Sequence, residues 1–262
     1  MMKLLVISLV AWFASSGGLA GETEGKARLL LPDLVQLPPT ELRVTPETSH
    51  GRRFLLTFRS SFANIGDGPL FVVGDRKSGA EPLMGATQRL ERSDGSTASR
   101  SNVGTFRYVY AEDHQHWHLL DFDRYELYSG RTGRPVRPTR KTGFCLNDEF
   151  RVRTHSRKAP RRFTDGCGLN HPELLQVNFG LSPGWGDSYR PFVEGQYINL
   201  SGVPTGIYLL VHHLNTRRHL RESNYRNDAA CVAFLLDWPH GSEAPPHLSR
   251  RPARFCQRRR GD

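Results

Sequence analysis

The chain has 262 residues, a formal net charge of +10 and 37% hydrophobic residues. This length suits one large domain or two small ones, and the excess of positive charge favours acidic partners such as a polymer, a membrane surface or a protein. The simpler interpretation is solvated surface charge in an arginine-rich chain. No nucleic-acid-binding motif accompanies the charge, so we expect no nucleic-acid partner.

The first residues have the layout of a secretory signal peptide. Lys3 gives a cationic start, an apolar run covers Leu4–Phe13, and small residues end at Ala20. The apolar run is too short for a permanent anchor, and no later segment is long and apolar enough for a transmembrane helix. We therefore predict a signal peptide over residues 1–20 and a secreted protein, extracellular or periplasmic. Removal of Lys3 would leave a net charge of 10 − 1 = +9.

Short apolar runs separated by turn-like segments fill most of the remaining chain. After an extended segment at 29–39, we predict strands within residues 52–66, 66–74, 105–128, 173–189, 196–202, 206–215 and 229–238. Residues 105–128 are expected to hold two strands, and 173–189 a strand followed by a glycine-rich loop. The polar residues 75–103 are expected to form a long loop or a weak hairpin, and 129–143 a basic connection.

This succession of short strands predicts an all-β fold, a β-sandwich with long loops and little helix. We find no internal repeat and no amphipathic helix of three turns. The expected organisation is a domain over residues 21–238 and a basic, proline-rich tail over residues 239–262.

Four cysteines follow the predicted signal peptide: Cys145, Cys167, Cys231 and Cys256. An even number in an oxidising compartment predicts two disulfides, for which three pairings are possible. None of the four belongs to a CxxC motif, so a zinc knuckle or thioredoxin-like site is not expected. Each disulfide would stabilise the fold by about 3 kcal/mol.

The segment "DHQHWHLLDF" at residues 113–122 places His114, His116 and His118 at alternate positions. Side chains alternate along a strand, so the three imidazoles leave it on one side, with neighbours about 6.6 Å apart. The outer rings can lean inward to meet a metal at roughly 2.0–2.1 Å. Copper and zinc both suit such ligands, and the motif does not choose between them. The alternative is a histidine-rich surface strand.

Several motifs, collinear along the chain, resemble the lysyl oxidase family. "HQHWH" resembles that family's copper-binding HxHxH motif, and "LPDLV" near the start resembles the beginning of its catalytic domain. The other matching motifs are "KTGFCLND" (141–148), "LSPGWGDSY" (181–189), "YINLSGVPTGIYLLV" (197–211) and "ESNYRNDAACVAF" (222–234). The resemblance runs from about Leu30 to Cys256.

The resemblance implies a copper-dependent amine oxidase. Its expected reaction is oxidative deamination of primary amines, chiefly peptidyl lysine in proteins, by dioxygen to give aldehydes, hydrogen peroxide and ammonia. Copper would be held by His114, His116 and His118. The second cofactor, lysine tyrosylquinone, would form from Lys141 and Tyr189. Because the chain has only five lysines, a lysine at the matching position is informative.

By the same resemblance, Cys145 would pair with Cys167, and Cys231 with Cys256, which would tether the tail. The chain also departs from the family pattern. The animal catalytic domains carry a cysteine in the histidine segment, where this chain has Glu112 or Asp113. They carry another beside the tyrosine, where Trp185 and Gly186 lie nearby here.

Amine oxidation needs a base with a pKa near neutrality, and Asp187, Asp121 or another histidine are the candidates. Glycine and proline in residues 138–144 and 182–189 would allow Lys141 and Tyr189 to lie apart before they join. Two alternative functions remain at this point. One is a non-catalytic copper- or zinc-binding β-sandwich, and the other is a basic adhesion module for acidic polymers.

Overall fold

The computed structural model describes residues 27–49, 51–111, 115–138, 141, 143–153, 159–191, 193 and 195–257. The predicted signal peptide, His114, Glu112 and Asp113 lie outside these residues. Within the described part, no helix has the length and apolar character needed to cross a membrane.

Strands make up nearly all of the regular structure that is described. In chain order the elements are β1 (Leu29–Leu30), β2 (Leu34–Gln36), β3 (Thr40–Glu47), β4 (Arg53–Asn64), β5 (Leu70–Asp75), β6 (Leu83–Arg92), β7 (Thr97–Tyr110), β8 (Gln115–Leu120), β9 (Asp123–Ser129), β10 (Pro135–Pro138), β11 (Gly143–Phe144), β12 (Phe150–Arg151), β13 (Gln176–Leu181), β14 (Trp185–Tyr189), β15 (Tyr197–Asn199), β16 (Gly206–Leu214), β17 (Ala229–Asp237), β18 (His247–Arg250) and α1 (Arg254–Gln257). The prediction of an all-β fold with little helix is confirmed.

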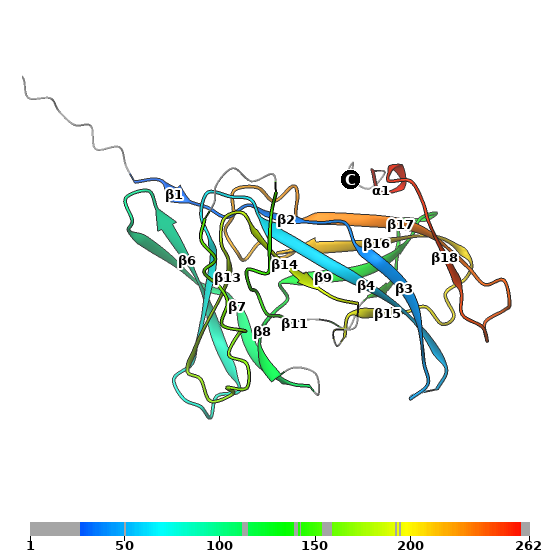
Figure 1. Cartoon of the computed structure of the whole chain (residues 1–262), viewed down its shortest axis with the longest axis horizontal. Coiled ribbons are helices and arrows are strands. Elements are labelled where there is room, and N and C mark those ends of the chain that lie inside the picture. The colour runs from blue at the N-terminus through cyan, green and yellow to red at the C-terminus, as the bar shows by residue number, and fades with distance from the viewer. Residues whose placement is uncertain are drawn as a thin grey trace, which may run out of the picture.

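The strands form three sheets, and the pairings between the described strands are antiparallel. The first sheet has the order β11-β8-β7-β6-β5-β13, with β1 beside β6. The second has the order β10-β9-β16-β17-β18, and the third β12-β14-β4-β15, with β2 and β3 also paired to β4. In Figure 1 the first sheet fills one half of the molecule, and β3, β4 and β16–β18 extend through the other half.

One hydrophobic core joins the three sheets. Phe106 of the first sheet, Tyr125 of the second and Phe62 of the third are all buried members of the same cluster. Phe58 on β4 meets Tyr125 edge to face, with ring centroids 5.2 Å apart. Such aromatic contacts add directional packing to the burial of apolar surface. The sheets are therefore packed layers around a shared interior.

Residues 75–103 differ from the loop that their polar composition suggests. They contain β6 and the first half of β7, two long paired strands, so the hairpin alternative is right and the loop alternative is wrong. Along β6 the side chains of Met84, Ala86, Gln88 and Leu90 alternate inward and are buried. After Leu83, the outward positions carry Gly85, Thr87 and Arg89, which hide the pattern in the sequence.

Two further boundaries need correction. Residues 105–128 hold parts of three strands, β7, β8 and β9, and His116 and His118 lie inside β8 rather than at a strand junction. The predicted glycine-rich loop includes β14, which pairs with β4 and β12. The predicted basic connection at 129–143 contains β10, which pairs with β9.

The structure contains two disulfides, Cys145–Cys167 and Cys231–Cys256, the pairs that the resemblance implies. The second joins β17 to α1 in the tail. Cys256 and its neighbour Phe255 pack beside Leu209 of β16, so the last described turn of the chain is fixed against the second sheet. In Figure 1, α1 lies near β17 at the end of the chain.

Candidate active site

Strand β8 brings two of the predicted metal ligands together. The Nε2 atoms of His116 and His118 lie 2.8 Å apart, and their ring centroids are 4.7 Å apart. His118 is 6% exposed, and Trp117 between the two histidines is fully buried, as expected for opposite faces of a strand. Converging imidazole nitrogens are the donors that copper and zinc accept, so these two residues fit a metal site. His114, the third predicted ligand, lies outside the described residues.

Strand β8 is supported along both edges. On one side β7 pairs with it, with Val109 opposite His116. On the other side β11 pairs with its last residues, and the backbone N–H of Trp117 donates to the carbonyl oxygen of Cys167 at 3.0 Å. The Cys145–Cys167 disulfide joins these two edge segments. The histidines are thus carried by a strand that is held on both sides.

A glycine is needed where β11 passes the histidines. A Cβ atom on Gly143 would lie 2.7 Å from the Cβ and 2.8 Å from the Nδ1 of His118. Contacts under 3.0 Å would force one of the two strands to move. The glycine in "KTGFCLND" therefore lets the segment that carries Lys141 pass directly beside the histidine strand.

Lys141 and Tyr189 are close together in the structure, although the loops predicted around them allowed them to be apart. The Nζ atom of Lys141 lies 5.1 Å from the centroid of the Tyr189 ring and 5.1 Å from that of Phe144. Lys141 is 6% exposed and Tyr189 is 8% exposed. An amine and a phenol ring from distant parts of the sequence thus share one buried space.

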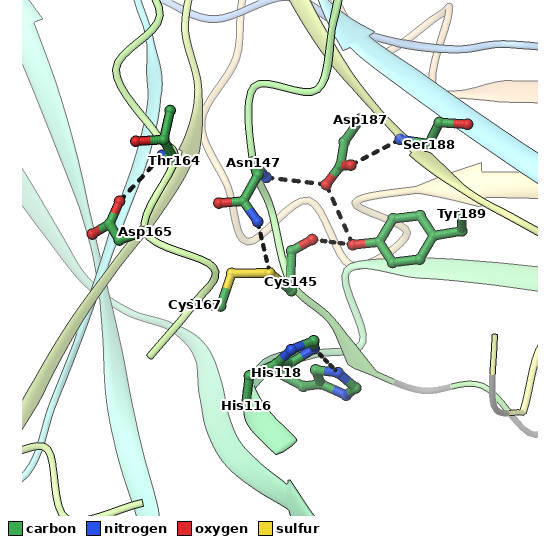
Figure 2. Close-up of a disulfide and its surroundings, with 10 residues drawn as sticks. All are labelled: His116, His118, Cys145, Asn147, Thr164, Asp165, Cys167, Asp187, Ser188 and Tyr189. Atoms are coloured by element: carbon green, nitrogen blue, oxygen red, sulfur yellow. Dashed lines mark hydrogen bonds between the residues drawn. A yellow bond between two sulfur atoms is a disulfide. The ribbon is translucent and has the colours of Figure 1, made fainter. Parts of the chain in front are cut away.

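Asp187 stands beside the Tyr189 hydroxyl. Its Oδ2 atom accepts the backbone N–H of Asn147 at 3.0 Å and lies 3.5 Å from the Tyr189 hydroxyl, which also donates to the carbonyl oxygen of Cys145. Figure 2 shows the Tyr189 hydroxyl directed at Cys145 and Asp187, and the rings of His116 and His118 turned toward each other.

Burial sets the acid–base character of this pair. It raises the pKa of Asp187 to about 7, despite backbone hydrogen bonds from Asn147 and Ser188 that favour the carboxylate. Burial, and then the charge of Asp187, raises the pKa of Tyr189 well above its ordinary value. Asp187 can therefore exchange a proton near neutral pH, whereas the Tyr189 hydroxyl stays protonated.

The other candidate bases lie in different settings. Asp121 is at a turn with a φ of 57°, and its half-exposed side chain pairs with Arg217 at 3.5 Å. His212 is fully buried, accepts or donates a hydrogen bond with Ser60 at 3.0 Å, and has a pKa lowered well below its ordinary value by burial. Of these groups, Asp187 is the one that contacts Tyr189.

Lys141 also lines a cavity of about 260 Å³. The other lining residues are Asp121, Asp123, Arg124, Tyr125, Pro138, Thr216 and Arg217. Asp123 is 2% exposed, its Oδ1 atom accepts a hydrogen bond from the backbone N–H of Arg124 at 2.7 Å, and burial raises its pKa. No pattern in the sequence marks Asp123 and Tyr125, because β9 comes beside residues 216–217 only through its pairing with β16.

The family model described as lysyl oxidase matches residues 74–238, more than half of the chain. The chain belongs to the lysyl oxidase family. The matched region includes the histidine strand, Lys141, Asp187 and Tyr189, and it begins at β5 and ends just after β17. The prediction of family membership is therefore confirmed.

Curated relatives agree over part of this region. Lysyl oxidase homolog 1 of Homo sapiens is 31% identical over 116 residues, which are 44% of this chain and 18% of that protein. Protein-lysine 6-oxidase of Sus scrofa is 32% identical over 117 residues, 44% of this chain and 41% of that protein. Lysyl oxidase homolog 3A of Danio rerio is 29% identical over 136 residues, 52% of this chain and 17% of that protein. The chain spans less than half the length of each of these relatives.

Proposed function

We propose that the chain is a copper-dependent amine oxidase that deaminates primary amines, chiefly peptidyl lysine, to aldehydes with dioxygen as the electron acceptor. Hydrogen peroxide and ammonia are the other products. The observation that carries the proposal is the buried pair of Lys141 Nζ and the Tyr189 ring, 5.1 Å apart. The relative named protein-lysine 6-oxidase supports the choice of substrate.

His114, His116 and His118 would hold the copper ion. The Nε2 atoms of the two described histidines already converge to 2.8 Å, and neutral imidazoles are suitable copper ligands. Lys141 and Tyr189 are the proposed precursors of lysine tyrosylquinone. Once formed, the quinone supplies the electron sink that amine oxidation requires and that ordinary side chains lack.

Asp187 is the proposed proton acceptor. Its Oδ2 atom lies 3.5 Å from the Tyr189 hydroxyl, and its pKa of about 7 leaves a substantial carboxylate fraction at neutral pH. A base with a pKa near the working pH is the most effective one. Lys141 must react as a neutral amine, and its burial limits the water that would solvate an ammonium group.

The cavity of about 260 Å³ beside Lys141 is the proposed substrate site. Asp123 and Tyr125 are buried side chains of its lining. An amine that enters the cavity would find the Asp123 carboxyl group in its lining as a hydrogen-bond acceptor. Asp123 thus orients the amine group, while Thr216 and Arg217 border the cavity.

The proposal includes export. A signal peptide at 1–20, a catalytic domain at 21–238 and a tail at 239–262 are its expected parts. The Cys145–Cys167 and Cys231–Cys256 disulfides suit an oxidising compartment, extracellular or periplasmic.

The test is hydrogen peroxide release from n-butylamine by copper-loaded protein, with and without phenylhydrazine, which blocks carbonyl groups. We expect activity that phenylhydrazine abolishes. Lys141→Ala and Tyr189→Phe should fold and bind copper but lack both the quinone absorbance and peroxide release. Lys77→Ala and Tyr110→Phe are the matched controls, because both residues are exposed, and they should stay active.

Peptide mass spectrometry completes this test. Active protein should yield a cross-linked peptide that contains both Lys141 and Tyr189. Fully active enzyme that yields the two peptides separately and unmodified would show that the mechanism is wrong. A protein that binds copper but releases no peroxide from any amine would instead be the non-catalytic metal-binding module.

A further inference from the structure

The loop between β16 and β17 carries a run of exposed basic residues. Its sequence from Asn215 to Arg221 is "NTRRHLR", in which Leu220 is buried and Arg217, Arg218 and His219 are exposed. The Arg217 side chain is 66% exposed, and the Arg218 guanidinium lies 5.2 Å from the centroid of the Tyr225 ring. Buried Leu220 and the contact between Arg218 and Tyr225 therefore hold in place a loop whose arginines are exposed.

This cationic loop, residues 216–219, borders three neighbouring cavities. Arg217 lines both the Lys141 cavity of about 260 Å³ and a second cavity of about 380 Å³, which His219 also lines. Arg218 lines a third cavity of about 340 Å³. A peptide that places an amine beside Lys141 must therefore pass its flanking residues over or beside this loop.

Most of the acidic residues around the same cavities are buried and do not offset this charge at the surface. Asp123, Glu126 and Asp228 are each less than a tenth exposed. Glu126 accepts hydrogen bonds from Arg124 at 2.6 Å and from the Tyr128 hydroxyl at 2.5 Å. Burial raises the pKa values of Asp123 and Asp228, which favours their neutral forms. Asp121 is the exposed acid of these cavities, and it already pairs with Arg217.

We propose that Arg217, Arg218 and His219 select lysine-containing peptides in which carboxylates flank the reacting amine. This inference rests on the proposed function, for which it names the substrate class. Guanidinium groups bind carboxylates through two parallel hydrogen bonds, so the loop distinguishes acidic from neutral flanks by geometry as well as charge. The exposed Arg217–Asp121 pair contributes little to stability, so a substrate carboxylate can replace Asp121.

The same charge also acts on the reacting amine. Nearby positive groups disfavour an ammonium ion and favour the neutral amine, which is the form that reacts. A peptide with cationic flanks would gain nothing from the loop and would be repelled by it. Acidic flanks offset the repulsion and keep the peptide in place, so binding and reactivity favour the same substrates.

The experiment measures kcat/KM for peroxide release with three blocked peptides of equal length and one lysine. The lysine is flanked by glutamate, glutamine or arginine. We expect the glutamate peptide to exceed the glutamine peptide by about tenfold, and the arginine peptide to be the poorest. The preference should weaken at high salt, because the loop is exposed and its charge is screened.

Variants assign the effect to the loop. Arg217→Glu should reverse the order of the glutamate and arginine peptides, and Arg217→Ala with Arg218→Ala should bring the three values together. Arg131→Glu is the matched control, since Arg131 is an exposed residue in the turn just after β9, and it should keep the wild-type order. The readout is the ratio between peptides within each variant, so a general loss of activity cancels.

The outcomes separate this inference from the proposed function. Peroxide release from n-butylamine with equal kcat/KM values for the three peptides would overturn the acidic-substrate inference alone. Absence of peroxide from every amine would overturn the proposed function. An order that Arg131→Glu changes as much as Arg217→Glu would show that bulk charge, and not the loop, determines the preference.

Discussion

His116 and His118 are neighbours on a single strand, whereas Lys141 and Tyr189 belong to segments that only the tertiary fold brings together. The histidine geometry follows from the alternation of side chains along β8. The lysine–tyrosine geometry needs β14 to pair with β4, and β11 to pair with β8. The histidine pair is therefore determined by the local sequence. The lysine–tyrosine pair depends on contacts between strands that are distant in sequence.

The short strand β11 couples the two pairs. Gly143 packs against His118, and Lys141 lies just before this strand. Just after it, the carbonyl oxygen of Cys145 accepts a hydrogen bond from the Tyr189 hydroxyl. A shift of this segment would move both pairs at once. Variants that change the histidine pair without changing the Lys141–Tyr189 pair, or the reverse, therefore test whether the two pairs act independently.

The largest effect is expected from His116→Ala. It removes the middle ligand of the predicted three, and an extended strand would place the Cα atoms of the remaining two about 13 Å apart. We expect loss of tight copper binding and of peroxide release, while the fold is kept, because His116 is only partly buried. Metal analysis after dialysis, with circular dichroism for the fold, measures both.

His247→Ala is the control for this prediction, since His247 is an exposed histidine on β18. It should retain copper as the wild type does. Full copper occupancy in the His116→Ala protein would show that the metal site has been assigned wrongly.

This contrast explains which parts of the site the sequence could reveal. The histidine motif can be recognised in the sequence because alternate residues of a strand lie on the same side. Lys141 and Tyr189 were predicted only by resemblance, since no local pattern says that a lysine and a tyrosine will meet. Asp123 and the cationic loop were missed because β9 and residues 216–219 come together only through the pairing of β9 with β16.

The fold shows the same division. Apolar runs such as those of β4, β16 and β17 were predicted as strands because their side chains are mostly buried. The β6–β7 hairpin was harder to predict because small and polar residues occupy its exposed face, and β14 because its buried positions include Gly186 and Asp187. Cross-strand pairing and burial of alternate residues determine those strands more than the intrinsic preferences of their residues.

An intermediate effect is expected from Asp187→Asn. If the Asp187 carboxylate accepts a proton, wild-type activity should rise as the pH increases through about 7. The asparagine variant should lose about 100-fold in kcat and lose this step in the pH profile. Asp165→Asn, at an exposed residue, should keep both. A wild-type step near pH 7 that survives in Asp187→Asn would assign the base to another group.

The same substitution makes a prediction about stability. The folded-state pKa of Asp187 is raised above its ordinary value of 3.8, so the folded protein binds this proton more tightly than the unfolded chain. The stabilisation from protonation is fully present below about pH 4 and is lost as the pH rises to about 7. Denaturant unfolding across this range should show a smaller decline for Asp187→Asn than for the wild type.

The smallest effect on activity, and the sharpest comparison, comes from the two disulfides. They close loops of similar length, with sequence separations of 22 and 25 residues. The chain-entropy model gives each about 3 kcal/mol, so Cys145→Ser/Cys167→Ser and Cys231→Ser/Cys256→Ser should lower the free energy of unfolding by similar amounts.

The surroundings of the two disulfides differ, however. Cys145 and Cys167 belong to the segments along one edge of β8, whereas Cys256 lies on α1 against β16 and β17. Loss of the first disulfide should therefore also weaken copper retention during dialysis, and loss of the second should leave it unchanged below the unfolding transition. Equal copper loss from both proteins would mean that general stability, and not the support of β8, holds the metal site together.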